Sequence, residues 1–252
     1  CANIGTPQEA QQAMKYGADG VGLFRSEFLF MDRDALPTED EQFEAYRTAA
    51  QTMAGKPLII RTLDVGGDKK LPTLELPHED NPFLGFRAIR MTLSHPEIFR
   101  PQLRAILRAA AYGDVRVMFP MIGSMDQLRE AKALLREQEQ TLQAEGVPTG
   151  PVKVGMMVEI PAAAVLAEEF AKEVDFFSIG TNDLTQYTLA VERGNAAVAH
   201  LYAPEHPAVL RLIAMTAQAA AERHIPCGMC GEAAGDPKLA PAFVGMGVNE
   251  LS

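Results

Sequence analysis

Short apolar runs recur along the chain, separated by polar turns and by longer stretches of helical period. The clear runs are 21–24, 57–63, 115–119, 154–158, 176–179 and 225–229, and the end fragments 2–4 and 248–251 resemble one further run each. Stretches with apolar residues at helical spacing lie at 7–16, 39–53, 98–111, 125–145, 161–172 and 209–224. Strands that alternate with helices predict right-handed crossovers and a parallel sheet.

The number of predicted strands, about eight, favours an α/β fold of the (β/α)8 TIM-barrel type, because eight strands close such a barrel. An open doubly wound sheet is the alternative, but no Gly-x-Gly-x-x-Gly opens a helix after the first strand. The chain stops at Ser252, directly after the last predicted strand, so we expect the final helix to be truncated. Residues 64–84 are too long for an ordinary loop and predict a functional insertion.

Composition is that of a globular protein, with 47% hydrophobic and 22% charged residues in a chain of 252. We expect one domain over 1–252, a fragment of a larger multidomain protein, since the chain begins with Cys1 rather than Met. The net charge of −10 argues against a broad nucleic-acid surface but allows a small basic pocket. No apolar window predicts a membrane span, no export signal is visible, and three cysteines fit a reducing cytoplasm.

Charged and polar side chains stand where the predicted strands end. Arg25 follows the second strand, Arg61 the third, Glu159 the fifth, Asp183 the sixth and Cys230 the seventh. Functional residues of a barrel come from the carboxyl ends of its strands. The two carboxylates suit Mg²⁺, which takes hard oxygen ligands, and the two guanidiniums suit a phosphate or carboxylate. Together they predict a site for a small anion bound with its metal.

Each of these residues has an ordinary explanation when it is taken alone. Arg25 could form a surface ion pair, Glu159 could be a satisfied core carboxylate, and Cys230 could be an inert buried thiol. Asn182 and Asp183 could cap a helix. The hypothesis of a functional site therefore depends on their convergence.

Cys227 and Cys230 have the spacing of a redox pair, but Cys227 lies inside an apolar run rather than at its end. No further Cys or His is near enough in sequence to complete a zinc site, and the five histidines are scattered without ligand spacing. The sequence therefore favours neither redox chemistry nor zinc binding at this pair, and it assigns no role to a histidine.

Five segments resemble a single family, and they appear in that family's order. They are GVGLFRSEFLFM (20–31), RTLDVGGD (61–68), NPFLGFR (81–87), GTNDLTQY (180–187) and GMCGE (228–232). They resemble the phosphoenolpyruvate-utilising enzymes, and the match is closest to the enzyme I branch of the bacterial sugar phosphotransferase system. Pyruvate phosphate dikinase and phosphoenolpyruvate synthase share TNDLTQ (181–186).

The resemblance implies a Mg²⁺-dependent, phosphoenolpyruvate-binding barrel that is dimeric in the family. By position, Arg25 and Arg61 match residues that bind the substrate phosphate, and Glu159 and Asp183 match the metal ligands. Cys230 matches the acid that protonates the pyruvate enolate. The positions that match further substrate contacts are Asn182, Asp183, Arg193 and, with a weaker match, Arg87.

The resemblance also implies partners. The family passes the phosphoryl group to a histidine on a separate phosphohistidine domain of the same protein and then to a small histidine-containing carrier protein, while pyruvate leaves. None of the five histidines here lies in a motif of that kind. Two alternatives stay open: a phosphoenolpyruvate sensor, which would not need the acid Cys230, and a Mg²⁺-dependent lyase or aldolase, which the two arginines disfavour.

Overall fold

The computed structural model describes residues 1–31, 33–67 and 78–252. Part of the predicted insertion, residues 68–77, therefore lies outside the described residues. The chain divides into two compact units, which we call the N-terminal unit (Ala2–Pro120 and Asp126–Lys153) and the C-terminal unit (Cys1, Met121–Met125 and Val154–Ser252).

The N-terminal unit contains four parallel strands, paired in the order of the sequence. They are β1 (Ala2–Ile4), β2 (Val21–Arg25), β3 (Leu58–Arg61) and β4 (Val115–Phe119). Nearly every residue of β2, β3 and β4 is buried. Such continuous apolar runs are typical of parallel strands that are covered on both faces.

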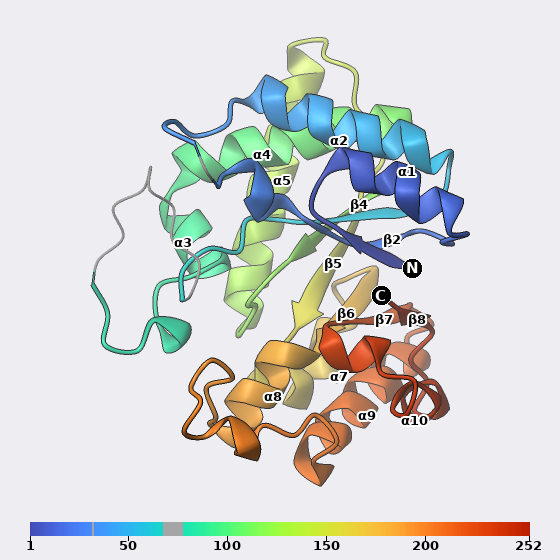
Figure 1. The fold of residues 1–252 in the computed structure, drawn as a ribbon. Helices are drawn as coiled ribbons and strands as arrows, with labels where there is room; N and C mark the ends of the chain where they lie inside the picture. The colour runs from blue at the N-terminus through green and yellow to red at the C-terminus, as the bar shows by residue number, and fades with distance from the viewer. Residues whose placement is uncertain (32, 68–77) are drawn as a thin grey trace. The chain divides into compact units, whose positions relative to one another are not determined.

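Helices accompany the sheet of the N-terminal unit, and those at 7–15, 39–53 and 96–109 pack side by side (Figure 1). They are α1 (Pro7–Lys15), α2 (Glu39–Met53), α3 (Ile89–Ser94), α4 (Pro96–Ala109) and most of α5 (Met125–Ala144). Helix α2 begins with a capping box in which Thr38 accepts from the Glu41 amide and Glu41 accepts from the Thr38 amide. This exchange satisfies backbone donors that have no partner within the helix.

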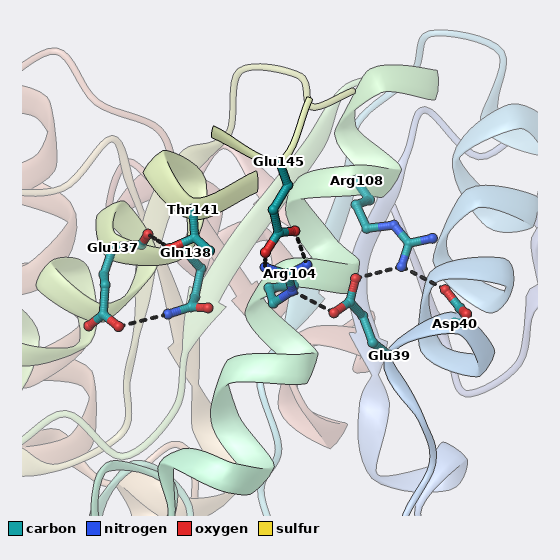
Figure 2. A network of polar contacts seen from close by, with 8 residues as sticks. All are labelled: Glu39, Asp40, Arg104, Arg108, Glu137, Gln138, Thr141 and Glu145. Carbon is teal, nitrogen blue, oxygen red and sulfur yellow. Dashed lines mark hydrogen bonds and ion pairs between the residues drawn. The ribbon is translucent and has the colours of Figure 1, made fainter. Parts of the chain in front are cut away.

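Ion pairs join α2 and α4 on the surface of this unit (Figure 2). Arg104 and Arg108 of α4 donate to the two carboxylate oxygens of Glu39, each at 2.5 Å. Arg104 also contacts Glu145, just beyond α5, at 2.7 Å, and Arg108 contacts Asp40 at 2.7 Å. A network of this kind stabilises helix packing more than isolated surface pairs do.

The C-terminal unit contains four more parallel strands in sequence order: β5 (Lys153–Val158), β6 (Phe176–Gly180), β7 (Cys227–Cys230) and β8 (Glu250–Leu251). Its helices are α6 (Pro161–Val165), α7 (Ala167–Phe170), α8 (Thr181–Leu189), α9 (Pro207–Glu222) and α10 (Ala240–Gly245). Helix α9 packs against α6 and α7 and against β6. Short 3₁₀ turns lie at η1 (Ser26–Leu29), η2 (Pro82–Leu84), η3 (Ala110–Tyr112), η4 (Ala199–Leu201) and η5 (Glu232–Gly235).

Eight parallel strands alternate with helices in the order of a (β/α)8 fold, so the predicted fold class is confirmed. Two details differ from the prediction. The helix expected over 161–172 is interrupted at Leu166, where the backbone (φ −99°, ψ 19°) leaves the helical range between α6 and α7. No helix was predicted over residues 181–189, although Asn182 and Asp183 were considered as residues that could cap one. These residues form α8, with Asn182 and Asp183 in its first turn and Gly180 at the N-cap position.

Candidate active site

Two predicted phosphate ligands stand at the ends of neighbouring strands in the N-terminal unit. Arg25 is the last residue of β2 and Arg61 is the last residue of β3. The two residues are partners in the register of the parallel pair. Residues at one register level of adjacent strands project to the same face, about 5 Å apart. The register of β2 and β3 therefore makes these two arginines neighbours.

Arg61 is buried between two carboxylates. One of its terminal nitrogens, Nη2, lies 2.6 Å from Glu27 Oε1, and the other, Nη1, lies 3.1 Å from Asp64 Oδ2. Arg61 is 6% exposed, Glu27 2% and Asp64 1%. Charges this deeply buried are stable only when they are paired and hydrogen-bonded, and removing one partner costs about 3–5 kcal/mol. Glu27 and Asp64 lie within the quoted motifs 20–31 and 61–68, but nothing in the sequence indicated that they pair with Arg61.

Asp64 also holds a third arginine. Arg87 donates from Nη2 to both carboxylate oxygens of Asp64, at 3.0 and 3.2 Å, and is 2% exposed. Asp64 itself lies between Leu63 and Val65, which are fully buried and fix the loop after β3. The structure thus brings Arg87 into one cluster with Arg61 through their shared carboxylate.

Glycine lets the chain approach Arg87 closely. Gly66 has a φ of 106°, and a Cβ atom built on it would lie 2.5 Å from Arg87 Cβ. Such a contact excludes every other residue type, both by the backbone conformation and by the lack of space. Gly66 of the 61–68 motif therefore leaves the space that Arg87 occupies. The Arg87 guanidinium also lies 5.9 Å from the centre of the Phe83 ring.

A buried glutamine joins the two strand ends that carry Arg25 and Arg61. Gln102 of α4 accepts from the Leu63 amide at 2.9 Å and donates to Ser26 Oγ at 3.0 Å and to the Tyr46 hydroxyl at 3.2 Å. Burial raises the pKa of Tyr46, which keeps that hydroxyl neutral. Gln102 is distant in sequence from Ser26 and Leu63, so no local sequence pattern indicated these hydrogen bonds.

The arginine cluster gathers positive charge at the ends of β2 and β3. Among the residues that the structure describes, it contains three guanidiniums (Arg25, Arg61 and Arg87) and two carboxylates (Glu27 and Asp64) that pair with Arg61 and Arg87. The net charge of the whole chain is −10, so three neighbouring guanidiniums are a local concentration of positive charge in an acidic protein. Local potential governs the binding of a small anion, and this cluster attracts one.

The C-terminal unit holds the predicted metal ligands. Glu159 follows β5, is 1% exposed and accepts a hydrogen bond on Oε1 from the Met121 amide at 2.6 Å. Asp183 lies in the first turn of α8 and is 7% exposed. A Cβ atom on Gly180, the N-cap of α8, would lie 2.8 Å from Glu159 Oε2. The carboxylate of Glu159 therefore contacts the main chain that starts the helix of Asp183.

This pair fits a hard divalent cation. Two carboxylates supply oxygen ligands, and Mg²⁺ commonly uses one or two carboxylates together with substrate oxygens and water. Within the described residues no group of three His, Cys, Asp or Glu side chains comes together, so a metal here would need further ligands besides these two carboxylates. The donor set is compatible with the predicted Mg²⁺, and the metal itself stays a prediction.

Cys230 is the last residue of β7 and is 3% exposed. The hydroxyl of Ser178, on β6, lies 3.9 Å from its Sγ and donates to it. Thr181 Oγ1 donates to the Cys230 carbonyl at 3.0 Å, and Asn182 Oδ1 accepts from the Glu232 amide at 3.2 Å. The first turn of α8 is thereby tied to the end of β7, so Asn182 and Cys230 belong to one neighbourhood.

Tyr202 lies near Asn182, Asp183 and Arg193 in the C-terminal unit. Its hydroxyl donates to the Asn182 carbonyl at 3.2 Å. Burial raises its pKa, while the Arg193 charge acts in the lowering direction and Asp183 acts in the raising direction. The backbone amide of Arg193 is held by Gln186 Oε1 at 3.1 Å. Sequence reasoning did not identify Tyr202, and no motif position singled it out.

Cys227 is unlike Cys230 in its setting. It is buried in β7, and burial together with the Glu250 carboxylate raises the pKa of its thiol to about 12. A thiol that stays protonated at neutral pH is a poor attacking group in disulfide exchange. This agrees with the sequence interpretation that the Cys227–Cys230 spacing does not mark a redox pair.

Comparison with known proteins gives the family. A family model described as "PEP-utilising enzyme, PEP-binding domain" matches residues 1–252, and the chain belongs to this family. Proteins named "Phosphoenolpyruvate-protein phosphotransferase" from Geobacillus stearothermophilus and from Bacillus subtilis (strain 168) are 57% and 55% identical over all 252 residues. The chain spans 44% of the length of each of these relatives.

Solved structures give the same fold at low identity. A HpcH/HpaI aldolase/citrate lyase family protein from Burkholderia cenocepacia J2315 aligns over 99% of this chain and 86% of its own, with a TM-score of 0.59 and 16% identity. The citrate synthase SbnG aligns over 99% and 84%, with a TM-score of 0.59 and 11% identity. At such identity the likeness concerns the fold alone. No helix among the described residues has both the length and the apolar character needed to cross a bilayer.

Proposed function

We propose that this chain is the phosphoenolpyruvate-binding part of a phosphoenolpyruvate-protein phosphotransferase, the enzyme that starts the sugar phosphotransferase relay. The main support is the buried arginine cluster at the ends of β2 and β3, in which carboxylates hold Arg61 and Arg87 in place. The 57% identical relative from Geobacillus stearothermophilus carries that name over the whole of this chain.

In the proposed reaction, Arg25, Arg61 and Arg87 bind the phosphate group, because planar guanidinium forks match phosphate oxygens. The bond from phosphorus to the bridging oxygen breaks, and its electrons stay on that oxygen as an enolate. The phosphoryl group passes to a histidine on a phosphohistidine domain of the same protein. Positioning and charge neutralisation are the main demands of such a transfer, and preformed arginines supply both.

Glu159 and Asp183 would hold Mg²⁺, which when bound neutralises negative charge on substrate oxygens. Asn182 and Arg193 provide further polar contacts to the carboxylate end of the substrate. The Cys230 thiol then gives its proton to the methylene carbon of the enolate, which becomes the methyl group of pyruvate, and the thiolate regains a proton from water. The Ser178 hydroxyl, 3.9 Å from Sγ, stabilises the thiolate left behind.

The proposed biological setting follows the relatives. Phosphoenolpyruvate and pyruvate are the small-molecule partners, and the small histidine-containing carrier protein receives the phosphoryl group from the phosphohistidine domain. We propose a homodimer that works in the cytoplasm and binds neither nucleic acid nor membrane.

Calorimetric titration of the chain with phosphoenolpyruvate and Mg²⁺ tests the proposal. We expect binding by the wild type and at least tenfold weaker binding by Arg61→Lys, which keeps a charge for Glu27 but loses the planar fork. Arg47→Ala, at an exposed pair with Glu44, is the control and should bind normally. A wild type that does not bind, or an Arg61→Lys variant with unchanged affinity, overturns the proposal.

A further inference from the structure

Arg25 is held differently from the other two arginines of the cluster. Carboxylates contact Arg61 and Arg87, but across residues 1–31, 33–67 and 78–252 no carboxylate forms an ion pair with Arg25. Its guanidinium carbon lies instead 4.8 Å from the centre of the Phe28 ring. Its Nε is buried without a hydrogen-bond partner among the same residues, a feature that does not distinguish Arg25 within the cluster.

Phe28 is placed by its surroundings although it is 44% exposed. It belongs to η1, the 3₁₀ turn that begins directly after Arg25. A Cβ atom on Gly5, in the loop after β1, would lie 2.5 Å from Phe28 Cδ2 and 2.8 Å from Cε2. The ring therefore rests against backbone that has no side chain, and any other residue at position 5 would push it away.

An aromatic ring and a carboxylate orient a guanidinium with different consequences. A carboxylate fixes the group but also cancels its charge, whereas the face of a ring attracts the cation and leaves its in-plane N–H donors available. The two carboxylates of the cluster are already shared by Arg61 and Arg87. Within the described part of the chain, Arg25 is thus the member of the cluster whose charge no carboxylate offsets.

We infer that Phe28 and Gly5 are positioning residues that hold Arg25 in the orientation needed for the substrate phosphate while leaving its charge uncompensated. This inference rests on the proposed function, because it presumes that Arg25 binds that phosphate. It adds two residues that carry no polar group and that the motif-based prediction did not single out.

Phe28→Leu and Phe28→Tyr form a matched pair for the test. Leucine keeps an apolar side chain and removes the ring, whereas tyrosine keeps the ring and can point its hydroxyl to solvent from a half-exposed site. In calorimetry with phosphoenolpyruvate and Mg²⁺ we expect Phe28→Leu to raise Kd about three- to tenfold and Phe28→Tyr to bind as the wild type does. Equal affinity of Phe28→Leu and the wild type overturns the inference.

A double-mutant cycle with Arg25→Ala separates positioning from general damage. If Phe28 acts through Arg25, then Phe28→Leu adds no further loss of affinity in the Arg25→Ala background. The same loss in both backgrounds contradicts the inference and leaves the proposed function intact. A wild type that binds no phosphoenolpyruvate overturns both.

Gly5→Ala gives a second, independent approach to the same ring. We expect it to raise Kd in the same direction as Phe28→Leu, because the new methyl group displaces Phe28. Gly245→Ala is the control, since a Cβ atom there meets nothing within 4 Å. As a readout without substrate, the Arg25 Nε–H proton resonance should lose its ring-current shift in Phe28→Leu and keep it in Phe28→Tyr. An unchanged resonance in Phe28→Leu contradicts the inference.

Discussion

Arg25 and Arg61 face each other across two adjacent parallel strands, one at the end of β2 and one at the end of β3. Like charges on neighbouring side chains repel each other. Glu27 and Asp64 offset the charge of Arg61, whereas Arg25 has no carboxylate partner among the described residues. An incoming anion would supply a counter-charge for Arg25, so we expect substrate binding to stabilise the folded state.

Asp64 should be important for stability because it contacts two buried guanidiniums, those of Arg61 and Arg87. We predict that Asp64→Ala lowers the free energy of unfolding by about 3–5 kcal/mol, since it leaves both cations short of a partner. Urea unfolding followed by circular dichroism measures the change. Glu44→Ala, which breaks an exposed pair with Arg47, should cost less than about 1 kcal/mol. A similar small cost for Asp64→Ala would contradict the prediction.

Glu159 should link phosphoenolpyruvate affinity to Mg²⁺. We predict that chelation of Mg²⁺ weakens binding by the wild type and has little effect on Glu159→Gln. Glutamine can still accept from the Met121 amide, so the local fold should persist while the charge is lost. Calorimetry with and without a chelator is the measurement, and exposed Glu168→Gln is the control. Equal dependence on Mg²⁺ in Glu159→Gln and the wild type would exclude Glu159 as a ligand.

We expect Cys230 to transfer a proton to the methylene carbon of the enolate. This step can be followed without a phosphoryl acceptor. We predict that the chain with Mg²⁺ exchanges the methyl protons of pyruvate for deuterium in D₂O, and that Cys230→Ser slows this exchange at least a hundredfold. Proton NMR of the pyruvate methyl signal gives the rate. Cys227→Ala should exchange at the wild-type rate, and undiminished exchange by Cys230→Ser would assign the proton to another group.

Alkaline pH should destabilise the fold through Cys227. Its thiol has a pKa of about 12 in the folded state, against an ordinary value of 9.0, because it is buried. Between these values the unfolded chain releases the proton and the folded chain keeps it, so stability is complete below pH 9 and falls as the pH rises towards 12. We predict that urea unfolding at pH 8 and pH 10.5 shows a loss about 2 kcal/mol larger for the wild type than for Cys227→Ala. Tyr46, whose pKa burial also raises, acts in the same direction in both proteins. Equal losses in the two proteins would rule out this role for Cys227.

Phosphoryl transfer to the carrier protein should depend on a phosphohistidine domain. We predict that the chain alone, supplied with phosphoenolpyruvate, Mg²⁺ and the small carrier protein, transfers no phosphoryl group to that carrier. The acceptor histidine belongs to the phosphohistidine domain in the proposed relay. Detection of phosphorylated carrier by mass spectrometry in this mixture would refute the assignment, and the full-length protein provides the positive control.

Much of the fold was predictable because parallel strands buried on both faces leave unbroken apolar runs. The run 115–119 and the helix 39–53 were predicted to the residue. The extent of helix α8 was not predicted, although a helix start at Asn182 and Asp183 was considered, because α8 begins at Thr181 directly after β6. When a helix follows a strand directly, the turn residues that usually indicate a boundary in the sequence are absent.

The sequence predicted that Arg25, Arg61 and Cys230 stand at strand ends, where the structure places them, but their supporting contacts were not predictable. The pair Arg61–Glu27 spans 34 positions, and Gln102 lies 76 positions from Ser26. Such contacts depend on strand register and helix packing, which no local pattern encodes. The functional assignment of Arg193 and Asn182 came from resemblance, and the structure adds Tyr202 as the residue that both approach.

Gly180 carries no functional group, yet it limits how the carboxylate pair could be redesigned. With Glu159 Oε2 this close to its bare Cα, an added methyl group would have to displace the carboxylate or the start of α8. A mutational library that varies position 180 should therefore return glycine alone among active clones. Efforts to broaden metal preference in this scaffold would have to alter Glu159 and residue 180 together.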